Sequence, residues 1–217
     1  MIVRGVLFDL DGTLVDSLDD LTAAVNHLLA DFGKPVLNTD AVRRMIGKGA
    51  RNLVQQALST DAPESVERGL QLFLAYNARH IADKSRLYPG ARETLEQLAA
   101  AGMRLAIVSN KNEALSRLIL QTLHVEQFFS VISGGDSHAE LKPSPLPLLR
   151  VMEQLGTTLE STAMVGDSIN DILAGRRAGM ITIGCNWGFG DPKELADANR
   201  MVASCAELTQ LLLSSEA

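Results

Sequence analysis

Two aspartates, Asp9 and Asp11, stand one residue apart directly after an apolar run in the segment FDLDGTLVDS. Each of two neighbouring carboxylates makes ionisation of the other less favourable, so this strand end favours a site for a strongly positive group. Mg²⁺ is such a group, since it prefers hard oxygen ligands and keeps part of its shell for water and substrate oxygens. A polar loop that simply follows a strand is the alternative interpretation.

Further polar side chains follow other apolar runs along the chain. Ser109 and Asn110 follow one run, and Asp167 follows another, with Asp171 four residues later at the start of a helical pattern. Lys142 lies in a proline-rich loop after a third run. Ligands of open parallel sheets bind beyond the carboxyl ends of the strands. We therefore predict that four carboxylates, a hydroxyl and a lysine converge on one edge of a sheet.

This combination of side chains fits metal-assisted phosphoryl transfer. Asp9, Asp11 and Asp167 could supply part of the shell of a divalent cation, which offsets the repulsion between a carboxylate and a phosphate. The glycine turn in DLDGT lets the second carboxylate take a different position from the first. One aspartate can then attack phosphorus while the other donates a proton to the leaving oxygen. Ser109, Lys142 and backbone N–H groups would hold the phosphoryl oxygens.

Short apolar runs alternate with helical patterns over most of the chain. Helical patterns such as 91–102 and 170–179 end at glycine, as helices often do. Compact apolar runs suit strands that are buried on both faces of a parallel sheet, so the alternation predicts an α/β fold with helices on both sides of the sheet. The predicted strands are 3–9, 103–109, 129–133, 162–167 and 180–185.

The segment from about 16 to about 88 shows helical spacing only. Apolar residues of 17–33 fall on one helical face, with Ser17 as the expected N-cap, and 40–58 and 64–81 follow the same pattern. The segment predicts a small all-α domain inserted after the first strand. We expect a catalytic core of residues 1–15 and 89–217 and a cap of residues 16–88.

Composition narrows the possible functions. The 217 residues are 46% hydrophobic and carry a formal net charge of −6, which argues against a nucleic-acid partner. Two cysteines are too few for a disulfide framework, and no signal peptide or membrane-spanning run is present in the sequence. We therefore expect a cytoplasmic protein without a membrane partner, either a monomer or a homodimer.

Four segments, DLDGTLVDS, IVSNK, LKPSP and VGDSIND, resemble in order and spacing the four motifs of the haloacid dehalogenase-like (HAD) hydrolases. The resemblance covers essentially the whole chain and implies a Rossmann-like three-layer core with a helical, C1-type cap. It implies that Asp9 is the nucleophile, Asp11 the general acid/base, Ser109 a phosphate ligand and Lys142 the group that steadies the phosphorylated aspartate. It further implies Mg²⁺ bound by Asp9, Asp167 and the backbone carbonyl of Asp11. Supporting residues would be Asp171, Ser168, Asn170 and Thr13.

Within that family the chain is similar to the phosphoglycolate phosphatases. A halide leaving group needs no proton, so Asp11 indicates a phosphatase rather than a dehalogenase, and the cap segment MIGKGARNLV resembles the glycine-rich cap stretch of that group. The resemblance implies a small phosphorylated metabolite as substrate, with 2-phosphoglycolate as the best single expectation. Lys48 stands where many such caps have Asn. The expected substrate-binding residues are Asn110, Gly47, Lys48, Gly49 and Arg51.

Other functions on the same scaffold stay open at this point. A β-phosphoglucomutase-like phosphotransferase would hand the phosphoryl group to a sugar hydroxyl, and a pyrophosphatase would differ only in its leaving group. A non-catalytic protein that binds a phosphorylated ligand is a further alternative. Lys48 and Arg51 could equally be a solvated helix start.

Overall fold

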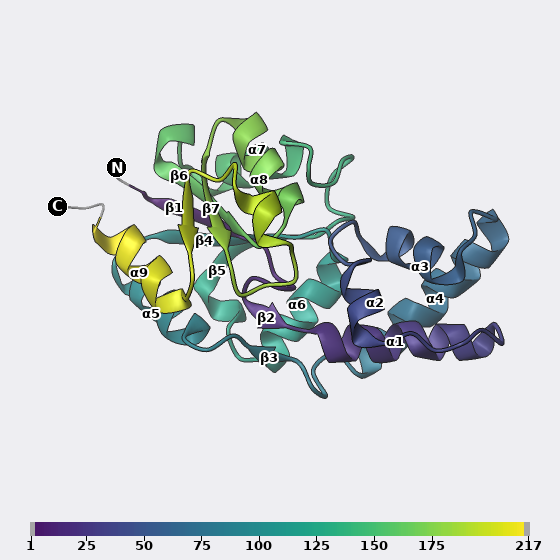
Figure 1. Ribbon diagram of the computed structural model, residues 1–217. Coiled ribbons are helices and arrows are strands. Elements are labelled where there is room, and N and C mark those ends of the chain that lie inside the picture. The colour runs from purple at the N-terminus through teal and green to yellow at the C-terminus, as the bar shows by residue number, and fades with distance from the viewer. Residues whose placement is uncertain (1–2, 215–217) are drawn as a thin grey trace.

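The computed structural model describes residues 3–214. Figure 1 shows a sheet flanked by helices, with helices α1–α4 projecting to one side and the two ends of the described residues on the opposite side. Within these residues no helix is both long and apolar enough to cross a membrane.

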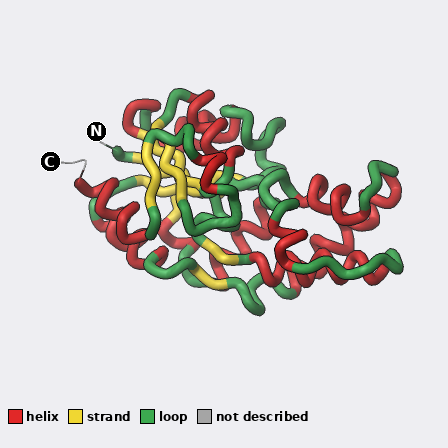
Figure 2. The backbone as a smooth tube through the Cα atoms, in the orientation of Figure 1, coloured by secondary structure: helices red, strands yellow, loops and turns green. Residues whose placement is uncertain are grey.

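The main sheet has six strands, all parallel, in the order β5-β4-β1-β6-β7-β8. Figure 2 shows these strands packed together in the middle of the core. Five of them correspond to the five predicted strands. The strands are β1 (Gly5–Phe8), β4 (Arg104–Val108), β5 (Phe129–Ser133), β6 (Thr162–Gly166), β7 (Ile181–Cys185) and β8 (Arg200–Val202).

Side chains of the central strands alternate between two helical layers. Leu7 of β1 lies opposite Ala106 and Met164, and this row packs against one layer. Val6 and Phe8 face the other layer. Because both faces are covered, every residue of β1 is buried, which explains its uninterrupted apolar sequence. The predicted three-layer α/β core is confirmed.

Five long helices form the two layers. One layer packs on the Val6 face and consists of α5 (Ala91–Ala100), α6 (Glu113–Thr122) and α9 (Cys205–Leu213). The other packs on the Leu7 face and consists of α7 (Leu146–Leu155) and α8 (Ile169–Ala178). Three short 3₁₀ helices complete the core: η1 (Glu126–Phe128), η2 (Leu159–Ser161) and η3 (Pro192–Leu195).

The inserted segment forms four helices around a hydrophobic core of its own, which includes Leu28, Val54 and Phe73. The predicted helical pattern 40–58 is broken in two by a loop in which Gly47 and Gly49 have positive φ. The helices are α1 (Leu18–Asp31), α2 (Thr39–Arg43), α3 (Ala50–Leu58) and α4 (Pro63–Arg79).

Two features differ from the sequence prediction. The two segments that connect the insertion to the core pair as a small antiparallel sheet, β2 (Val15–Asp16) with β3 (Arg86–Leu87), although 16–88 shows only helical spacing. The edge strand β8 was not predicted, because three residues are too few to show a period.

Candidate active site

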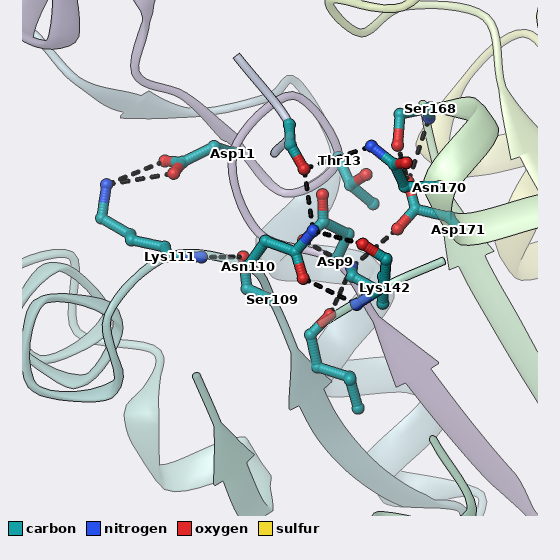
Figure 3. A network of polar contacts seen from close by, with 12 residues as sticks. Asp9, Asp11, Thr13, Ser109, Asn110, Lys111, Lys142, Ser168, Asn170 and Asp171 are labelled. Atoms are coloured by element: carbon teal, nitrogen blue, oxygen red, sulfur yellow. Dashed lines mark hydrogen bonds and ion pairs between the residues drawn. The ribbon is translucent and has the colours of Figure 1, made fainter. Parts of the chain in front are cut away.

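The carboxyl edge of the main sheet carries the predicted polar residues. Asp9 follows β1, Ser109 follows β4 and Asp167 follows β6, so three adjacent strands deliver them to one place. Figure 3 shows Asp9 and Lys142 close together there, with Ser109 nearby, its hydroxyl accepting a hydrogen bond from the backbone N–H of Lys111 at 3.3 Å. Of the four carboxylates expected to converge, the structure brings Asp9, Asp167 and Asp171 together, whereas Asp11 turns to other partners.

Three carboxylates form a compact acidic cluster. Asp9, Asp167 and Asp171 each offer an oxygen within 4.8 Å of the others. Asp167 and Asp171 are 2% and 1% exposed. Burial raises the pKa of Asp167 to about 7, and repulsion from Asp9 and Asp171 adds to the shift. Burial also raises the pKa of Asp9 to about 6, against the attraction of nearby Lys142.

Lys142 lies between two of these carboxylates. Its Nζ is 2.9 Å from Oδ1 of Asp9 and 2.6 Å from Oδ1 of Asp171. Burial lowers the pKa of Lys142, but the Asp171 and Asp9 carboxylates more than reverse this and raise it above its ordinary value. Three carboxylates and one ammonium leave two negative charges in a buried site. A divalent cation therefore fits the charge and the hard oxygen donors of the cluster.

Asp171 is fixed by the start of helix α8. Its Oδ2 accepts hydrogen bonds from the backbone N–H and the hydroxyl of Ser168, at 3.0 and 2.6 Å. This is a capping box with an acidic residue at the third helical position, which the helix dipole also favours. Local helix chemistry thus holds the partner of Lys142 in place.

Asp167 is held by groups from two loops. Thr13 donates to Oδ1 at 2.8 Å, and the backbone N–H groups of Phe189 and Gly190 donate to Oδ2 at 2.7 and 3.3 Å. A Cβ on Gly12 would lie 2.3 Å from Oδ2 of Asp167, so only glycine allows this close approach. The contribution of the 188–190 loop was not predicted, because backbone donors leave no signature in residue types.

The Asp11 carboxylate is directed away from the acidic cluster. Lys111 Nζ donates to its two oxygens at 3.2 and 3.0 Å, and Ser17 Oγ donates to Oδ1 at 2.6 Å. Ser17 does precede α1 as predicted, but its hydroxyl makes no helix-capping hydrogen bond and serves Asp11 instead. Lys111 belongs to the motif IVSNK, and its position just after a buried strand was the signal that could have identified it.

The cap loop rests on two asparagines of the core. The side-chain amides of Asn110 and Asn170 both donate to the carbonyl oxygen of Gly47, at 2.9 and 3.2 Å. Asn110 also exchanges two hydrogen bonds with the backbone of Lys142, at 2.8 and 2.9 Å. Gly49 lies close by, since a Cβ there would be 3.2 Å from the carbonyl oxygen of Asn110. The structure thus places the cap glycines directly over the site.

The expected cationic residues of the cap lie farther out. Lys48 is exposed and lines a cleft of about 760 Å³ that reaches Asp9 and Asp167. Arg51 is exposed and forms an ion pair with Glu67 on α4, at 2.7 Å. The structure brings Lys48 to the edge of the site and directs Arg51 away from it.

The fold and the site together define a cap-covered acidic centre of the kind that binds a divalent cation with an anionic ligand. A family model for haloacid dehalogenase-like hydrolases matches residues 6–185. The chain belongs to this family, which confirms the resemblance seen in the motifs.

Curated relatives and a solved structure agree with this assignment. The chain is 38% identical over 215 residues to a phosphoglycolate phosphatase of Chromobacterium violaceum, covering 97% of this chain and 96% of the relative. It is 40% identical over 205 residues to that of Neisseria meningitidis, covering 91% and 87%. A crystal structure of a predicted phosphoglycolate phosphatase from Haemophilus somnus superposes with a TM-score of 0.88 at 31% identity, covering 98% of both chains.

Proposed function

We propose that the protein is a Mg²⁺-dependent phosphatase that hydrolyses a small phosphorylated acid, with 2-phosphoglycolate as the best candidate. The observation that carries the proposal is the buried cluster of Asp9, Asp167 and Asp171 with Lys142 at the carboxyl edge of the sheet. The names of the relatives support the choice of substrate.

Asp9 is the proposed nucleophile. Its carboxylate lies where β1 ends, beside Lys142 and the acidic cluster, and lines both cavities next to the cap. Attack by this carboxylate on phosphorus forms an aspartyl phosphate, which water then hydrolyses. Asp11 is the proposed acid/base that gives a proton to the leaving oxygen, and its carboxylate lines the same cavities.

Ser109 and Lys142 are the proposed ligands of the phosphoryl oxygens. Ser109 and Lys142 line the smaller cavity together with Asp9. A donor and a fixed positive charge at this position stabilise the charge that spreads over the phosphoryl oxygens in the transition state.

Asp9 and Asp167, with the backbone carbonyl of Asp11, are the proposed metal ligands, and Asp171 supports them. Burial and neighbouring carboxylates raise the pKa values of Asp9 and Asp167, and a bound divalent cation would reverse this effect. Bound Mg²⁺ supplies charge neutralisation, which lets an anionic carboxylate approach an anionic phosphate.

The cap of residues 16–88 is proposed to enclose the substrate against the core of residues 1–15 and 89–217. We propose that Asn110 and the cap loop with Gly47, Lys48 and Gly49 bound the substrate, and that Arg51 reaches it only by leaving its ion pair with Glu67. Enclosure excludes bulk water while the phosphorylated aspartate forms.

Steady-state phosphate release tests the proposal. The substrates are small phosphorylated acids, sugars and nucleotides, offered with Mg²⁺ and after chelation. We expect phosphoglycolate to be among the best substrates and Asp9→Asn to lose roughly 1,000-fold or more in kcat while keeping the wild-type fold. Substantial Mg²⁺-dependent turnover by folded Asp9→Asn protein would refute Asp9 as the nucleophile.

A further inference from the structure

A small cavity of about 60 Å³ lies between cap and core, beside Asp9 and Ser109. On the cap side its wall is apolar and includes Leu21, Leu53 and Phe73. A water-sized group needs roughly 10–15 Å³ of such space, so the cavity accepts a group of only a few non-hydrogen atoms. This limit applies to whatever part of a substrate extends from the phosphate toward the cap.

One polar side chain interrupts the apolar wall. Asn77 of α4 lines the cavity, is 2% exposed, and its Oδ1 has no hydrogen-bond partner within residues 3–214. A buried amide oxygen without a partner is unfavourable, which indicates a ligand group that completes its hydrogen bonding. Since an amide can turn to exchange its oxygen and NH₂, Asn77 can serve either an acceptor or a donor.

Lys111 supplies a positive charge to the same cavity. Its side chain is 7% exposed and its present partner is the Asp11 carboxylate. Asp11 would keep the 2.6 Å hydrogen bond from Ser17 if Lys111 turned to another anion. Lys142, which also lines the cavity, is already engaged by two carboxylates. Lys111 is therefore the cation best placed to exchange its partner for a ligand.

We propose that Lys111 and Asn77 form the recognition site for the leaving group, a short alcohol that ends in a carboxylate. The carboxylate takes the place of Asp11 on Lys111 and accepts a hydrogen bond from the Asn77 amide. This exchange releases the Asp11 side chain toward the ester oxygen, so recognition of the anionic end also positions the proposed acid. The inference rests on the proposed phosphatase activity and assigns to Lys111 the role that the sequence suggested for Lys48 and Arg51.

Binding of two non-hydrolysable probes tests this assignment. The probe 3-phosphonopropionate has the shape and charge of phosphoglycolate, whereas propylphosphonate lacks the carboxylate. We expect calorimetry with Mg²⁺ to show that the wild-type protein prefers the first probe by about 10- to 100-fold, as charge-assisted hydrogen bonds predict. Lys111→Met should abolish this preference and Asn77→Leu should reduce it.

Lys84→Met is the matched control, because Lys84 is exposed and its side chain is outside both cavities. It should keep the wild-type preference. If Lys111→Met does not fold, Lys111→Gln and Asn77→Leu are used instead to measure the ratio of the affinities for the two probes. Equal affinity of the wild-type protein for both probes, or an unchanged preference in folded Lys111→Met, would overturn the assignment.

Failure of the phosphatase proposal would give a different result. In that case neither phosphoglycolate nor ethyl phosphate would release phosphate, whatever the probes bind. Conversely, equal kcat/KM for these two esters with normal turnover would reject the carboxylate subsite and leave the phosphatase intact.

Discussion

At the scale of the residue, the aspartates of this site differ by their immediate partners. Asp9 faces the Lys142 ammonium, Asp167 accepts hydrogen bonds mostly from backbone N–H groups, and Asp11 is paired with Lys111. These different partners hold like carboxylates in different positions and so suit them to different tasks. The four carboxyl groups can thereby serve in the proposed roles of nucleophile, metal ligand, acid and support.

Removal of the Thr13 hydroxyl tests whether its hydrogen bond orients Asp167 in the acidic cluster. Thr13 is fully buried and donates to Asp167 at 2.8 Å. Thr13→Val keeps the shape but leaves the carboxylate oxygen without this donor, so we expect Mg²⁺ affinity to fall by about 10- to 100-fold. The loss of a buried hydrogen bond should also lower the free energy of unfolding by ~1–3 kcal/mol.

Mg²⁺ titration followed by thermal unfolding measures both effects. Thr122→Val is the control, because the exposed Thr122 hydroxyl bonds only within its own helix α6. A Thr13→Val protein with wild-type Mg²⁺ affinity would mean that Thr13 does not orient Asp167.

At the scale of the element, the cap depends on a close approach of helices α3 and α4. Gly69 sits in the interior of α4, where glycine is intrinsically unfavourable. A Cβ at this position would lie 2.8 Å from Val54 and 2.9 Å from Leu58, which are fully buried on α3. The glycine is therefore explained by packing.

Gly69→Val should loosen the cap. Overpacking of a filled interface costs about 1–3 kcal/mol, which exceeds the small gain in helix propensity. The midpoint of urea unfolding should fall. The KM for substrate should rise, because the cap covers the site. Ala75→Val, at an exposed position of α4, is the control for β-branching. An unchanged midpoint for Gly69→Val would contradict the packing argument.

At the scale of the whole molecule, the sequence predicted the elements that compact apolar runs and helical periodicity determine. Strands such as β1 and β6 are buried on both faces, so their sequences are almost entirely apolar and easy to detect. The polar residues that follow them, Asp9 and Asp167, then had to share the carboxyl edge of the sheet.

Features that depend on distant partners could not be predicted in this way. The direction of the Asp11 carboxylate is set by Lys111, 100 residues away in the chain. The Asn77 Oδ1 lacks a hydrogen-bond partner among the described residues because apolar side chains of the cap line the cavity around it. Local spacing places Lys111 after a strand but does not show which side chain it contacts, and it gives no sign of the wall around Asn77.

The acidic cluster also makes the stability of the whole protein depend on pH and metal. In the metal-free protein the pKa values of Asp9 and Asp167 are raised to about 6 and about 7. Their contribution to stability is therefore fully present below the unfolded pKa of 3.8 and is lost as pH rises through 6 to 7. A divalent cation binds the deprotonated carboxylates, so we expect excess Mg²⁺ to raise Tm more at about pH 8 than at about pH 5.

Thermal unfolding at both pH values, with and without Mg²⁺, measures this difference. Asp167→Asn is the comparison, because it removes one titrating carboxylate and one proposed ligand together. The Mg²⁺-induced rise in Tm should shrink in this variant at the higher pH. A rise that is the same at both pH values in the wild-type protein would show that protons and metal do not compete for the cluster.

The paired strands β2 and β3 restrict how the cap can swing. The two segments that connect the cap to the core lie side by side in one short ladder, with Val15 opposite Leu87. A rigid cap attached through this ladder would rotate about a single axis. Asp11 and Ser17 lie beside β2, whereas α3 lies farther from the paired strands (Figure 1) and would move more in such a rotation. A small rotation would thus lift the Gly47 loop clear of the core for product escape while the proposed acid stays almost where it was.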